Sequence, residues 1–190
     1  MPSKAFTNHL KVVLEDANEI VKAHSALKTG VAGRQYGLGA LNRAVVVMCI
    51  SAWEVYVEEV LKETIELLKP DTPPLGTWPS LNASVRSAIG RFNNPNTQHC
   101  KEIFQQSLGL DDITQDWSWK PTTPKKVSKR LEEAIKLRHE IAHGTTPRPI
   151  VHNQQYAKRL PGFFIKLGEC TDAGLTSYLQ MTFNISTGWT

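Results

Sequence analysis

The side chains best suited to chemistry stand together in a short segment near position 140. Arg138 supplies a permanent positive charge, while His139 and His143 supply imidazoles, which gain or lose a proton readily near neutral pH. Glu140 places a carboxylate between the two histidines. An arginine with a histidine can bind a phosphate and move a proton, whereas two histidines with a glutamate can hold a metal ion and supply a base. The segment therefore fits two different chemistries.

The metal interpretation rests on the pattern His-Glu-x-x-His, which His139 and His143 complete and which zinc peptidases carry on one helical face. A third ligand is hard to find in the sequence. Six residues after His143 stands Pro149 rather than a histidine, and the downstream glutamate, Glu169, lies 26 residues away. His152 is closer but lies among prolines. A zinc peptidase is thus the lesser alternative, and we expect neither a metal nor a cofactor.

A helix with clear start and stop signals is expected to carry this segment. Thr123 is suited to be its N-cap, Pro124 fits its first position, and Gly144 fits the residue after its last turn at His143. Its apolar residues recur at helical spacing and predict one buried stripe. That stripe contains Val127, Leu131, Ala134 and Ile135 and is expected to continue through Ile141 and Ala142.

Arg138 falls on this apolar stripe, which requires an explanation. A guanidinium within a core is costly unless an acidic group pairs with it, and Glu54, beside Trp53 on another apolar helix, is the natural partner. Such a pair could serve a site or simply join two helices.

His143 lies about 140° around the helix axis from Arg138, so one helix does not aim both side chains at one atom. Two copies related by a two-fold axis could complete one site together.

Helical periodicity predicts the elements that must position these residues. The long second helix is expected to bury a stripe that includes Val45, Ala52, Val55, Tyr56 and Val60. Residues 71–124 are expected to form short pieces, with Trp117 and Trp119 folded onto the body. Four principal helices plus short ones predict an all-α bundle, a single domain over residues 1–190. The expected helices are Ala5 to Leu27, Leu38 to Leu68, Asn96 or Thr97 to Leu108, Thr123 to His143 and Asn153 to Thr182.

Composition narrows the class of protein. No apolar run approaches the roughly 18 residues that a membrane span needs, and the N-terminus lacks the apolar core of a signal peptide. The three cysteines are widely spaced and predict reduced thiols, so a cytoplasmic location is expected. Between Lys120 and Lys166 stand 11 lysines and arginines against 3 glutamates, whereas the rest of the chain is acidic. A basic half of this kind suits a polyanion such as RNA, although a solvated basic face without a partner explains it equally well.

The segment from Arg138 to His143 resembles the Arg-x4-His motif of the HEPN superfamily, and more narrowly of RiboL-PSP-HEPN domains. The resemblance extends to the run from Ser51 to Val57, with its Glu-aromatic signature, and to the run from Phe92 to Asn96. It spans about Leu38 to Gly144. One position departs from the family, because His139 stands where a small polar residue, often asparagine, is common.

The resemblance implies an all-helical homodimer whose two motifs face each other across a cleft. Active members are metal-independent endoribonucleases, many of them toxins or defence proteins with an antitoxin or another regulatory partner. In this sequence, His143 would be the acid or base at the ribose 2′-hydroxyl, and Arg138 would bind the scissile phosphate. His139, Glu54 and Glu140 would support them. Other members are non-catalytic interaction modules, and that function remains the alternative.

Overall fold

The computed structural model describes residues 1–27, 38–70, 77–145 and 154–189, and the named elements within these ranges are all helices. No strand occurs within these ranges; a single bridge joins Trp119 to Thr122. The prediction of an all-α fold is therefore confirmed. In chain order the elements are the π-helical turn η1 (Phe6–Leu10), α1 (Lys11–Ala26), α2 (Leu38–Leu67), α3 (Thr77–Ile89), α4 (Thr97–Leu108), the 3-10 turn η2 (Ile113–Asp116), α5 (Pro124–Ala142) and α6 (Gln154–Phe183).

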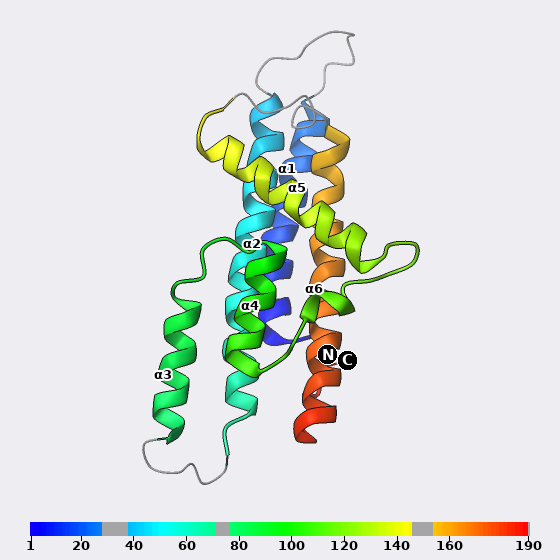
Figure 1. Cartoon of the computed structure of the whole chain (residues 1–190). Coiled ribbons are helices and arrows are strands. Elements are labelled where there is room, and N and C mark those ends of the chain that lie inside the picture. The colour runs from blue at the N-terminus through cyan, green and yellow to red at the C-terminus, as the bar shows by residue number, and fades with distance from the viewer. Residues whose placement is uncertain (28–37, 71–76, 146–153, 190) are drawn as a thin grey trace.

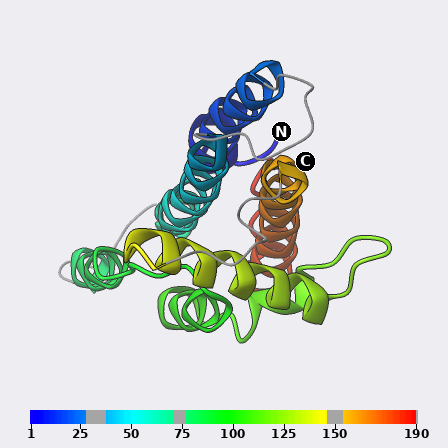
Figure 2. The ribbon, with the colours of Figure 1, turned by 90° about the horizontal axis from the view of Figure 1, so that it is seen from above.

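Three long helices form the body of the molecule. Helices α1, α2 and α6 lie side by side along its long axis, with α1 running opposite to α2 and α6 (Figure 1). Helix α5 lies across this body, so that its two ends reach α2 and α6 (Figure 2). Helices α3 and α4 flank α2. None of the described helices is both long enough and apolar enough to cross a membrane.

Helix α2 is the central element because it is buried around most of its circumference. Trp53 is fully buried, stacks on Tyr56 at 5.3 Å between ring centroids, and meets Trp117 edge-on at 5.8 Å. Its indole N–H donates to the Pro95 carbonyl at 3.1 Å. One sequence expectation for this helix was wrong: Val55 is 40% exposed, because the buried face is centred on Trp53 instead.

A polar network joins the start of the chain to the core. Asp172 on α6 accepts hydrogen bonds from the Ser3 amide, the Ser3 hydroxyl and the Tyr56 hydroxyl, at 2.7–2.9 Å. Burial raises the pKa of Asp172, although these hydrogen bonds oppose the rise. The N-terminal ammonium also donates to the Gly188 carbonyl at 3.4 Å, so the two ends of the chain meet (Figure 1).

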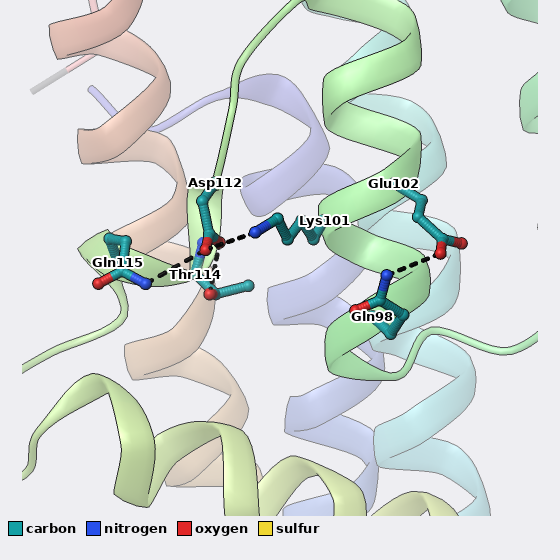
Figure 3. Close-up of polar contacts among 6 residues, drawn as sticks. All are labelled: Gln98, Lys101, Glu102, Asp112, Thr114 and Gln115. Carbon is teal, nitrogen blue, oxygen red and sulfur yellow. Dashed lines mark hydrogen bonds and ion pairs between the residues drawn. The ribbon is translucent and has the colours of Figure 1, made fainter.

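The connection between α4 and η2 is held by one carboxylate. Asp112 accepts from the Thr114 amide and hydroxyl, from Gln115 and from the Lys101 ammonium (Figure 3). Burial favours the neutral acid, but these hydrogen bonds outweigh it and lower the pKa of Asp112. The turn fixed in this way delivers Trp117 into the core, where its indole N–H donates to Thr171 at 3.0 Å.

Most predicted boundaries agree with the structure to within a few residues, and two expectations need correction. The middle of the chain contains a 13-residue helix, α3, which periodicity did not single out because it buries little beyond Val85 and Ile89. The buried stripe of α5 ends at Leu137: Ile141 is half-buried and Ala142 is exposed. The last turn of α5 therefore lies at the edge of the core, where Ile141 packs against it and Ala142 does not.

Gly168 on α6 should control how closely η1 approaches the body. A methyl group at this position would overlap the Leu10 side chain and lie 3.0 Å from the Phe6 ring. We expect Gly168→Ala to lower the free energy of unfolding by about 1–3 kcal/mol through overpacking, as measured by urea denaturation. Gly162→Ala, on the same helix with nothing within 4 Å, should instead raise it by up to about 1 kcal/mol. Equal effects of the two substitutions would contradict this account of the packing.

Candidate functional site

Helix α5 has defined ends that place residues 138–143. Thr123 is its N-cap and Pro124 its first residue, as predicted, although the Thr123 side chain makes no capping hydrogen bond. At the other end Gly144 takes a left-handed conformation with φ of 65°. The Gly144 amide donates to the Ile141 carbonyl at 3.2 Å and the Thr145 amide to the Glu140 carbonyl at 3.1 Å. These two bonds form a Schellman cap, which fixes the last turn of the helix.

Arg138 meets Glu54 of α2, as the sequence predicts for an arginine on an apolar stripe. Its Nη2 lies 3.3 Å from Glu54 Oε2, and the two side chains are 28% and 20% exposed. Burial raises the pKa of Glu54, and the charge of Arg138 opposes that rise. A guanidinium has five N–H donors, and Glu54 takes one of them. The pair is therefore anchored between two helices yet remains open to solvent on one side.

The two histidines form a separate, exposed pair on the last turn of α5. The ring centroids of His139 and His143 lie 4.3 Å apart, with 59° between the ring planes. Both residues are exposed, whereas Arg138 turns towards α2. Within one chain the helix thus presents Arg138 and His143 in different directions, as their spacing predicts. Glu140 is half-buried, and its carbonyl accepts the cap bonds from Thr145.

A zinc site would require a third ligand beside His139 and His143. His139 and His143 are close enough to share an ion, but no group of three His, Cys, Asp or Glu side chains with metal-binding geometry occurs among the described residues. Glu169, on α6, does not join the two histidines. His152 lies outside the residues that the structure describes.

A second cluster of cations lies along α5, nearer its start. Lys126, Lys129 and Arg130 of α5 and Arg159 of α6 line a hollow of about 550 Å³, together with Glu133, Gln155 and Tyr156. The basic character of residues 120–166 is evident in the sequence, but it does not distinguish these residues from the other cations there. The excess of charge was the available signal, and it could not show that two helices bring these particular cations together.

The energy of the Arg138–Glu54 contact can be measured with a double-mutant cycle. Because both side chains retain contact with water, we expect a coupling energy of only about 0.2–1 kcal/mol between Arg138→Ala and Glu54→Ala in urea denaturation. Both single variants should fold. A coupling of about 3 kcal/mol or more would show that the pair behaves as a buried structural bridge.

Comparison with known proteins identifies the family of the chain. The sequence profile of the RiboL-PSP-HEPN family matches residues 12–177, which covers most of the chain. No curated protein and no solved structure matches the chain significantly. The matched region includes Glu54 and the whole of α5 with its Arg-x4-His motif. The chain belongs to the RiboL-PSP-HEPN family of the HEPN superfamily.

Proposed function

We propose that this chain is a metal-independent endoribonuclease and that two copies build one catalytic site from their Arg138 and His143 side chains. HEPN domains are often ribonucleases, and the family match supports that class of activity. The observation that carries the proposal is the hydrogen bonding and solvent exposure of the Arg138 side chain. Among the described residues its guanidinium donates one hydrogen bond, to Glu54, and the side chain is 28% exposed, so other donors can reach a phosphate.

The proposed reaction uses the substrate's own 2′-hydroxyl as the nucleophile. One His143 accepts the 2′ proton, the 2′ oxygen bonds to the adjacent phosphorus, and the bond from phosphorus to the 5′ oxygen breaks. The His143 of the second copy protonates that leaving oxygen. The products carry a 2′,3′-cyclic phosphate and a 5′-hydroxyl, so protons and bonds balance without an added co-reactant.

Arg138 would act on the phosphate during this step. Its N–H groups would pair with the non-bridging oxygens, whose negative charge grows as the 2′ oxygen attacks. Glu54 would be a positioning residue, since it contacts Arg138 rather than the reacting atoms. His139, 4.3 Å from His143 between ring centroids, is placed to support that ring or to contact a neighbouring phosphate.

The need for a second copy follows from the directions of these side chains. Arg138 turns towards α2, whereas His143 is exposed on the last turn of α5. One chain would also supply only one of the acid and the base. A symmetric dimer that brings the two α5 ends together would supply both histidines and both arginines to one phosphate. A chain whose Arg138–Glu54 pair merely joins two helices would instead act as a non-catalytic module.

Cleavage assays in EDTA test the proposed reaction. We expect RNA cleavage to persist in the chelator and to fall at least about 100-fold in both Arg138→Ala and His143→Ala, because each removes charge stabilisation or proton transfer. His9→Ala, on η1, is the matched histidine control and should retain full activity. Stoichiometric zinc that disappears in His139→Ala would instead favour the peptidase chemistry, and loss of RNA cleavage in EDTA would contradict the metal-independent reaction. A folded dimer that cleaves no RNA would favour the non-catalytic module.

Mixing experiments test whether the site is shared between chains. A growing excess of inactive His143→Ala chain should lower the cleavage rate of a fixed amount of wild-type chain, because mixed dimers contain a single His143. An equal mass of an unrelated inert protein is the control. A wild-type rate that stays constant after full exchange of subunits would mean that each chain carries a complete site.

A further inference from the structure

The hollow between α5 and α6 has an uncompensated positive charge. Lys126, Lys129, Arg130 and Arg159 supply four cations against the single carboxylate of Glu133. Within the described ranges, none of the four lies within 4.0 Å of a carboxylate oxygen. Other cations of this protein, such as Lys22, Lys62 and Lys166, do form such pairs. Cations that line a hollow and lack protein anions are suited to an anionic ligand.

Arg130 lines this hollow, and two contacts orient its guanidinium. Its guanidinium carbon lies 4.5 Å from the centroid of the Phe163 ring, and its Nη2 donates to the Arg159 carbonyl at 3.2 Å. The residue is half-buried, and burial lowers its pKa. A guanidinium fixed by an aromatic face and one carbonyl has donors left over and loses little entropy when it binds a phosphate.

Tyr156 adds an unused hydroxyl to the same wall. The oxygen is shielded from solvent and has no hydrogen-bond partner among the described residues. Burial raises the pKa of Tyr156 to about 12, so the group stays a neutral O–H donor. A buried hydroxyl without a partner is unfavourable, and a small rearrangement towards a bound phosphate would give it an acceptor.

We propose that this hollow binds phosphates of the RNA backbone and so holds the strand that the Arg138 and His143 site cleaves. This assignment rests on the proposed ribonuclease function. Arg130 and Arg138 are eight residues apart on one helix, so the two sites are about 12 Å apart along its axis. That separation spans a few nucleotides of one strand. Cations predominate among its described lining residues, so its proposed role is to position the strand.

The test measures binding of a labelled 2′-O-methyl RNA oligonucleotide, which has phosphates but no 2′-hydroxyl to react. Lys129→Gln/Arg159→Gln removes two exposed cations of the hollow, and Lys11→Gln/Lys22→Gln removes two exposed cations of α1 as the matched control. We expect the first variant to weaken binding about 10-fold and to reduce the slope of log Kd against log salt concentration by about 1.4. The control should bind like wild type, and both should keep the wild-type Tm.

Removal of the one acidic group of the hollow provides a test with the opposite sign. Glu133→Gln should strengthen oligonucleotide binding several-fold, whereas Glu15→Gln, on α1, should not. Inorganic phosphate and ATP serve as competitors that separate a backbone phosphate from a free nucleotide. Displacement of the oligonucleotide by ATP at concentrations near those of the protein would assign the hollow to a nucleotide and overturn the proposal.

The two proposals fail in distinguishable ways. Unchanged binding by Lys129→Gln/Arg159→Gln, in a preparation whose wild type still cleaves RNA, would overturn the role of the hollow and leave the catalytic proposal standing. Binding that depends on the hollow in a chain that cleaves no RNA would support the hollow and overturn the catalytic proposal.

Discussion

The burial of Trp53 on α2 is the constraint on which the rest of the structure depends. Its ring contacts Tyr56 of its own helix, Trp117 after η2 and Phe164 of α6, and its N–H reaches the turn before α4. The Trp53 side chain therefore contacts four parts of the chain: its own helix, the segment after η2, helix α6 and the turn before α4. A large aromatic group with its only donor satisfied can be fully buried at little polar cost, which makes it a suitable centre for the packing.

The burial of Trp53 also determines the position of Glu54 on α2. Once Trp53 faces the core, its neighbour Glu54 lies at the edge of the buried face, where α5 crosses. The carboxylate is half-buried and needs a cation, and Arg138 is the residue of α5 that passes over it. The pair thus links the core to the candidate site. Displacement of Trp53 would move Glu54 and, with it, the orientation of the Arg138 guanidinium.

Helix α5 contributes to both the candidate site and the basic hollow because it lies across the body rather than along it. Its Arg138 end overlies α2, and its Arg130 side faces α6 (Figure 2). A helix parallel to its neighbours would have buried one continuous stripe. A crossing helix buries residues from Val127 to Leu137 and leaves Ala142 and His143 exposed at its end. His143 is exposed there, where the proposed second copy would meet it, and the Schellman cap at Gly144 keeps it at the helix end.

The sequence by itself determined every described α-helix except α3, together with the ends of α5 and the pairing of Arg138 with Glu54. These features rest on local signals, namely proline and glycine at helix ends, periodicity, and the cost of an unpaired charge on an apolar face. Tertiary structure decided the rest. It exposed Val55 and Ala142, which periodicity alone placed in the core, because the angle at which helices cross sets where burial stops. It also gathered Arg130, Tyr156 and Arg159 around one hollow, since residues distant in sequence become neighbours only once α5 and α6 pack.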